Sequence, residues 1–168
     1  MLYFRPLLTY FELIRYSFLY FFSFFKKNKI KHSSNEYFFA YSRDSIKLLI
    51  HKLFAEKRKK INLFVPCFFC WEIIEYIKSD NVRIFWYDLD ENLNPKFDII
   101  NYSPDIILVV DFFGIQINVD LVRKFCEINN SSLIFDNTHC LNSEIKLLKN
   151  EFLIKSHYKH FPIPNGAS

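Results

Sequence analysis

Three segments of the chain place apolar residues at the spacing of amphipathic helices. In the clearest of them, apolar side chains recur at positions 46, 49, 50 and 53, and Ser42 is placed to cap the first turn. The pattern predicts helices over residues 42–54, 70–78 and 120–128.

Between these helices lie short apolar runs of the kind that form buried strands. The clearest run is Asp-Ile-Ile-Leu-Val-Val-Asp at 105–111, and the others are 61–65, 82–87, 132–135 and 152–155. Strands that alternate with helices predict an α/β fold of three layers, with a mostly parallel sheet covered by helices on both faces. Ligands of such sheets bind beyond the carboxyl ends of the strands, so the residues to inspect are Pro66, Asp111 and Asp136.

Residues 1–27 follow a different pattern. Positions 7–25 form an apolar, aromatic stretch about as long as a bilayer span, but Glu12 and Arg15 interrupt it, and each is costly in hydrocarbon. We expect an apolar N-terminal helix over 1–27 that packs on another subunit or on a missing part of a larger protein. A helix on the membrane surface, through residues 2–25, and a true span are the alternatives. Residues 28–37 are polar and predict a linker.

Composition narrows the function classes. The chain has 168 residues, of which 51% are hydrophobic and 24% charged, which indicates one folded domain. It holds only 2 glycines and no glycine-rich phosphate loop, which excludes nucleotide-binding folds built on one. A net charge of +4 without a wide basic stripe does not predict a nucleic-acid partner.

The four cysteines lie in apolar stretches, at positions 67, 70, 126 and 140. No cleavable signal peptide precedes them, so we expect reduced thiols and a cytoplasmic protein, with membrane association as the alternative. Cys67 and Cys70 are spaced like metal ligands, but no second closely spaced pair accompanies them. We therefore expect no metal site.

Candidate chemistry gathers near the C-terminus. Asp136 follows a predicted strand and His139 comes three residues later; alone, each is also typical of a cap or a loop residue. Lys159 lies among aromatic residues and prolines at 156–166. Burial beside positive charge favours the neutral, nucleophilic form of an amine, as a lysine that bonds to a carbonyl group requires.

The order of these segments over about 38–168 resembles the DegT/DnrJ/EryC1/StrS family of pyridoxal-phosphate-dependent sugar aminotransferases, which have the aspartate-aminotransferase fold (fold type I). The resemblance rests on the blocks 41–46, 64–70, 85–90, 109–114 and 133–139 and on the closing lysine block, 156–166. It implies that residues 38–168 are the N-terminal part of a fold-type-I large domain, truncated after the lysine block.

The resemblance also implies a cofactor, pyridoxal 5'-phosphate, and roles for individual residues. Lys159 would bond to the cofactor and later move a proton, Asp136 would pair with the pyridine nitrogen, and His139 would lie against the hydroxyl side of the ring. The residues implied for the phosphate are Ser42, Arg43 and Ser156.

Some positions depart from the family pattern. Ser42 stands where the family has glycine, and Cys70 stands where an aromatic ring usually stacks on the cofactor, with Phe69 and Trp71 beside it. The sequence also stops at Ser168, before the rest of such an enzyme, so we expect a fragment, a truncated product or a degenerate descendant.

Two function classes therefore stay open. The first is an aminotransferase that acts on a nucleotide-linked keto-sugar in surface polysaccharide biosynthesis, with glutamate as amino donor. It would work as a homodimer or with a complementing second chain. The second is a non-catalytic α/β module that serves as a partner subunit or is a remnant. A generic doubly wound domain of the flavodoxin or response-regulator kind is a third reading, which leaves Lys159 unexplained.

Overall fold

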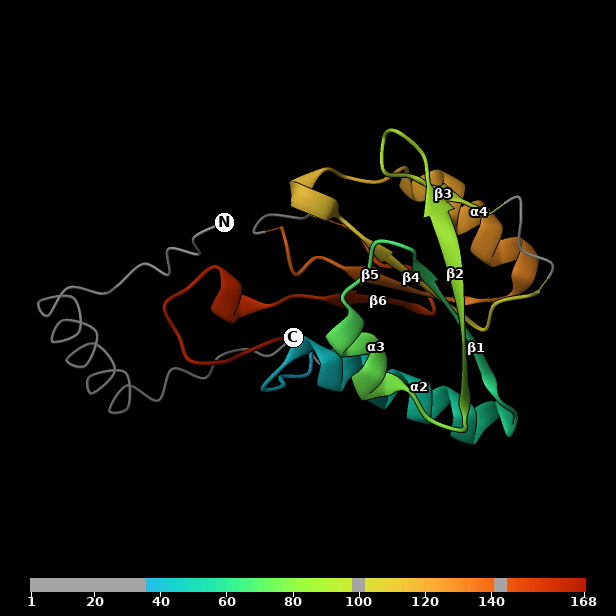
Figure 1. The fold of residues 1–168 in the computed structure, drawn as a ribbon, viewed down its shortest axis with the longest axis horizontal. Helices are drawn as coiled ribbons and strands as arrows, with labels where there is room; N and C mark the ends of the chain where they lie inside the picture. Colours follow the sequence, from blue (N-terminus) through green and yellow to red (C-terminus); the bar gives the residue numbers. More distant parts are fainter. Residues whose placement is uncertain (1–35, 98–101, 141–144) are drawn as a thin grey trace, which may run out of the picture.

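A computed structural model describes residues 36–97, 102–140 and 145–168, and its centre is a six-stranded sheet in the order β3-β2-β1-β4-β5-β6 (Figure 1). All neighbouring strands run parallel except β3, which pairs antiparallel with β2. The strands are β1 Ile61–Pro66, β2 Val82–Leu89, β3 Pro95–Lys96, β4 Ile106–Val110, β5 Ser132–Asp136 and β6 Glu151–Ile154.

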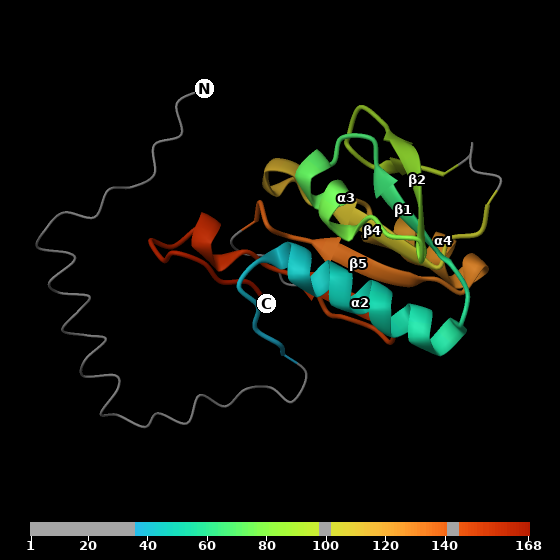
Figure 2. The same cartoon turned by 60° about the horizontal axis from the view of Figure 1, so that its bottom comes forward.

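Helices cover both faces of the sheet. The helices α2 Ser42–Lys57 and α3 Trp71–Ile77 lie on one face and α4 Val119–Asn129 lies on the other (Figures 1 and 2). Each face has its own apolar cluster, because successive strand residues point to opposite faces. Leu63 and Leu108 pack with Ile46 of α2, whereas Phe64 and Phe135 pack with Val122 of α4. The predicted three-layer α/β fold is confirmed.

Helix α2 begins where the sequence predicted, but its cap differs. Tyr41 is the N-cap residue and Ser42 is the first helical residue, so the prediction of Ser42 as cap is wrong. The Asp44 carboxylate accepts a hydrogen bond from the Tyr41 backbone N–H at 3.3 Å and so satisfies a donor at the start of the helix. The helix ends at Lys57, three residues beyond the predicted end, and the next residue, Arg58, adopts a left-handed conformation.

The strand order indicates where along the sheet a binding site is expected. The chain passes from β1 through α3 to β2, then returns to the other side of β1 and continues through β4, α4 and β5. The direction of progress across the sheet therefore reverses between β1 and β4, and binding sites of open α/β sheets lie beyond the carboxyl ends near such a reversal. Pro66, Asp111 and Asp136 lie at this edge.

The start and the end of the described chain meet beside the lysine block. Phe39 and Ala167 exchange two backbone hydrogen bonds of 2.9 Å, and Ala167 also forms a β-bridge with Ser156. The predicted N-terminal helix over 1–27 lies outside the described residues, as does the linker 28–37 apart from Glu36 and Tyr37. Within the described ranges, no helix is long and apolar enough to cross a membrane.

Candidate cofactor site

Asp136 is the last residue of β5 and is 2% exposed. Every residue of β5 is buried, so the strand fixes where this carboxylate lies. Its Oδ1 atom accepts a hydrogen bond from the Thr138 backbone N–H at 3.0 Å. Burial raises the pKa of Asp136, and the bonds from Thr138 and the charges of Lys159 and His139 act in the opposite direction.

Lys159 lies in the short 3-10 helix η2 His157–Lys159, which follows β6. Its Nζ atom donates a hydrogen bond to Thr138 Oγ1 at 3.3 Å, so it lies beside the residues that follow β5. Lys159 is exposed, and the prediction that aromatic neighbours bury it is wrong. The Tyr158 ring packs on Tyr41 instead, and Phe161 is itself exposed.

His139 completes the group around Asp136. Partial desolvation lowers the pKa of the His139 ring, and the charges of Lys159 and His160 lower it further. The charge of Asp136 acts in the opposite direction. These effects together favour the neutral form of the imidazole. The structure thus brings together the three predicted catalytic residues, Asp136, His139 and Lys159.

The start of α2 lies next to the lysine block. The Gly166 backbone N–H donates to the Ala40 carbonyl at 3.0 Å, and the rings of Tyr41 and Tyr158 meet edge to face with centroids 6.3 Å apart. This contact places Ser42 near the block that carries Ser156. Ser156 is fully buried, and its hydroxyl group has no hydrogen-bond partner within the described structure.

Arg43 is engaged by aromatic rings. Its guanidinium lies 4.7 Å from the ring centroid of Tyr41 and 5.1 Å from that of Tyr76. The Tyr76 hydroxyl in turn donates to the Asp44 carboxylate at 2.7 Å. Asp44 thus places a negative charge in the first turn of α2, where it opposes the binding of an anion.

Sequence reasoning missed Thr138, and it named Asp111 only as a strand end. Thr138 contacts both Asp136 and Lys159. No motif could have shown this contact, because it depends on how the lysine side chain lies. Asp111 is also buried, at the end of β4; burial raises its pKa, and the nearby charge of Asp136 adds to this effect. Asn137, the first residue after β5, is 1% exposed, and its side-chain amide makes no hydrogen bond of standard geometry within the described structure.

The residues after β1 have other partners. Trp71 is exposed and stacks on Trp86 of β2, with centroids 6.5 Å apart and ring planes at 11°. Phe69 packs against the apolar cluster beneath α2 and α3, and Cys70 is the exposed N-cap residue of α3. Among the described residues, no three histidine, cysteine or acidic side chains are grouped so as to hold a metal ion.

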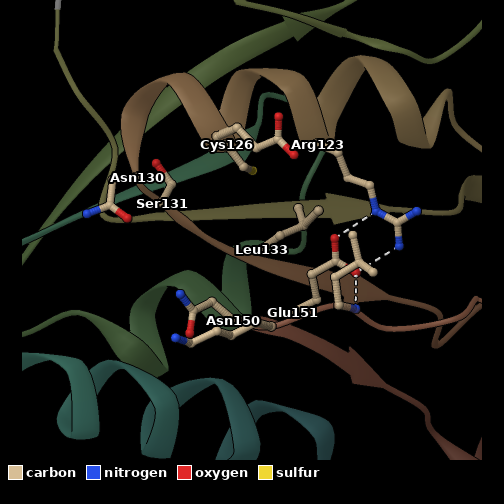
Figure 3. Close-up of a pocket in the computed structure, with 10 residues that line it drawn as sticks. Arg123, Cys126, Asn130, Ser131, Leu133, Asn150 and Glu151 are labelled. Atoms are coloured by element: carbon tan, nitrogen blue, oxygen red, sulfur yellow. Dashed lines mark hydrogen bonds and ion pairs between the residues drawn. The ribbon is translucent and has the colours of Figure 1, made fainter.

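A pocket of about 300 Å³ lies at the amino ends of β5 and β6 (Figure 3). It is formed by the C-terminal half of α4 and by the first residues of β5 and β6, including Leu133 and Glu151. Arg123 crosses it and makes hydrogen bonds of 2.7 and 2.8 Å to the two carboxylate oxygens of Glu151. The pocket is remote from Asp136 and Lys159, since these residues follow the carboxyl ends of the same strands.

Comparison with solved structures places this arrangement among known folds. An E. coli GDP-4-keto-6-deoxy-D-mannose-3-dehydratase with bound hydrated pyridoxal phosphate matches with a TM-score of 0.58 and 21% identity, over 78% of this chain and 38% of that one. Helicobacter pylori PseC, an aminotransferase of pseudoaminic acid biosynthesis, matches with a TM-score of 0.61 and 17% identity, over 77% and 38%. The chain has the fold of part of a fold-type-I large domain.

The fold-type-I match is partial in length and distant in sequence. A GDP-4-keto-6-deoxymannose-3-dehydratase (ColD) variant with bound GDP-perosamine also matches, with a TM-score of 0.59 and 20% identity, over 77% of this chain and 38% of that one. The chain thus spans about two fifths of the length of the structures it matches. No family model and no curated protein matches the sequence.

Proposed function

We propose that the chain is a pyridoxal-phosphate-dependent, aminotransferase-like protein that acts on a nucleotide-linked keto-sugar, with glutamate as amino donor. One observation carries the proposal. Asp136 ends β5 and Lys159 follows the neighbouring parallel strand β6, and both contact Thr138, at 3.0 Å to the Asp136 carboxylate and 3.3 Å to the lysine amine. A cofactor that has both an aldehyde and an aromatic ring nitrogen needs such a pair, an amine for the aldehyde and a carboxylate for the nitrogen.

The residues present suit the ring end of the cofactor. Asp136 offers a buried carboxylate for the pyridine nitrogen, and Lys159 offers an exposed amine that can condense with the aldehyde and release water. His139 offers an imidazole whose neutral form is favoured by partial burial. Pyridoxal phosphate, when bound, supplies an electron-accepting ring. Asp136 would hold the proton on its nitrogen, and Lys159 would move the proton that transamination requires.

The phosphate end fits only in part. Ser156 is a buried hydroxyl group without a partner, and the start of α2 lies beside it. Arg43, however, lies on two tyrosine rings, and Asp44 adds a negative charge to the same turn. These two features favour the alternative function, a non-catalytic module that serves as a partner subunit or is a remnant.

The substrate and the assembly are extensions of this proposal. One matched dehydratase structure holds GDP-perosamine, and another holds glutamate in a trapped pyridoxal phosphate adduct. We propose that the chain works as a homodimer or with a complementing second chain. The phosphate would meet Ser42 and Ser156, with Arg43 released from its rings.

The test is covalent capture of the cofactor. We expect an absorbance band when pyridoxal phosphate is added to the folded chain. After borohydride reduction, peptide mapping should find the adduct at Lys159, and Lys159→Arg should abolish it. Lys96→Arg, at an exposed position of β3, is the matched control and should change nothing. Scattered labelling of surface lysines in a folded chain would contradict the proposal and support the non-catalytic module.

A further inference from the structure

Thr138 lies between the two residues that the proposed function needs. It is the second residue after β5 and is 3% exposed, so its own position is fixed by packing. Its backbone N–H donates to Asp136 Oδ1 at 3.0 Å, which holds the start of the loop against the carboxylate. Its side chain therefore has a defined place beside Asp136.

The Thr138 hydroxyl group faces Lys159. The lysine Nζ atom donates to Thr138 Oγ1 at 3.3 Å, across the gap between the segments that follow β5 and β6. A lysine side chain on an exposed turn is flexible, and fixing it costs rotamer entropy. A hydrogen bond to Thr138, which packing already holds in place, selects one of the many conformers of the lysine side chain.

The same hydroxyl group can serve both neighbours. A threonine hydroxyl accepts through its oxygen and donates its single hydrogen. When it accepts from the lysine ammonium, its hydrogen remains available to the Asp136 carboxylate. Burial raises the pKa of Asp136, and the Thr138 side chain acts against that rise. Lys159 thus contacts the side chain of Thr138, while the backbone N–H of Thr138 contacts Asp136.

We infer that Thr138 is a positioning residue, whose hydroxyl group holds the Lys159 amine at a fixed separation from the Asp136 carboxylate. The inference rests on the proposed function, because this separation matters only when both groups engage one cofactor. Thr138 itself does not react. By holding the amine in place, Thr138 increases the rate at which Lys159 attaches to the cofactor.

The first experiment needs no cofactor. Thr138→Val keeps the shape and removes the hydroxyl group, whereas Thr138→Ser keeps the hydroxyl group. Each folded chain is treated with a trace of acetic anhydride at pH 7.5, and acetylation of Lys159 is measured by mass spectrometry relative to the exposed Lys96. We expect Thr138→Val to raise the relative acetylation of Lys159 about threefold, since the amine is no longer held against Thr138 and is more accessible to the reagent. Thr138→Ser should stay near the unmodified chain. Equal acetylation in all three would overturn the inference.

The second experiment follows the rate of pyridoxal phosphate capture at Lys159 by borohydride reduction. We expect Thr138→Val to slow capture about tenfold although its amine is more reactive, and Thr138→Ser to restore it. A merely structural role would change both readouts in the same direction, and that result would overturn the inference. If the unmodified chain captures no cofactor, the proposed function fails, and the acetylation experiment still decides whether Thr138 holds Lys159. Circular dichroism confirms that each variant is folded, and Thr138→Ala replaces Thr138→Val if that variant unfolds.

Discussion

Asp136 ends β5, Asp111 directly follows the neighbouring strand β4, and both carboxyl groups are buried. Burial disfavours the charged form of each and raises both pKa values, and the charge of Asp136 adds to the shift at Asp111. For Asp111 the structure offers a hydrogen bond of 3.4 Å from the Ile117 backbone N–H, which compensates only in part. Asp111 is thus a destabilising residue when it is charged.

The pH dependence of stability follows from that shift. The folded chain holds the Asp111 proton more tightly than the unfolded chain, so the stability that Asp111 contributes is present at low pH. It is lost as the pH rises from the ordinary pKa of 3.8 through the raised value. Asp111→Asn removes this titration, and we expect its unfolding free energy to exceed that of the unmodified chain more at pH 7.5 than at pH 4.5. Urea unfolding at both values measures the difference. The exposed Asp88→Asn on β2 is the control, and an equal gain at both pH values would contradict the explanation.

The individual site residues were predictable to different degrees. Asp136 was found because an apolar run ends there, and a carboxylate at a buried strand end needs a reason. The exposure of Lys159 was not predictable, because the Tyr158 ring packs on Tyr41 and Phe161 is exposed to solvent. Composition near a residue says little about burial when the rings can face away from it.

At the scale of elements, the buried strands were the easiest to predict. All five residues of β4 are buried, since one side packs beneath α2 and α3 and the other beneath α4, and such a strand has an uninterrupted apolar sequence. Strand β3 was missed because it has two residues and depends on a turn. In that turn, the Asp90 carboxylate accepts hydrogen bonds from the backbone N–H groups of Asn92 and Asn94. Short polar turns leave no hydrophobic pattern.

The first turn of α2 depends on Asp44. Its carboxylate binds the Tyr41 backbone N–H and the Tyr76 hydroxyl of α3, so it both caps α2 and joins the two helices. We expect Asp44→Ala to lower the unfolding free energy by about 1 kcal/mol, the usual cost of a lost cap. Tyr76→Phe removes the hydroxyl bond alone and should cost less. Denaturant titration compares the two variants, and a larger loss from Tyr76→Phe would show that the cap is the minor contribution.

At the scale of the whole molecule, the site depends on contacts between segments that are distant in the sequence. We call the pairing of residues 36–40 and 155–160 with residues 166–168 the seam. Residues 36–40 and the lysine block both pair with the segment around Ala167, whose neighbour Ser168 exchanges backbone hydrogen bonds with Lys155. This seam holds the start of α2 beside η2. The sheet supplies Asp136, and the seam supplies the surroundings of Lys159.

Ala167→Pro tests the seam. Proline removes the backbone N–H that donates to the Phe39 carbonyl, while no residue of the candidate site changes. We expect amide hydrogen exchange to rise by about tenfold in peptides that cover 36–41 and 155–160, and to stay unchanged in β4. Ala167→Ser retains the donor and is the control. An increase spread over the whole sheet would instead show that the variant unfolds globally.

The seam also sets the order in which the protein assembles during synthesis. A ribosome releases residues 36–40 early, but their strand partner around Ala167 comes more than a hundred residues later. The nascent chain can pair β1 with β2 and then with β4 while it grows, whereas the Lys159 block has no fixed surroundings until the segment around Ala167 has left the ribosome. A chain stalled before Ala167 would thus carry a nearly complete sheet, and the surroundings of Lys159 would form only after that residue has emerged.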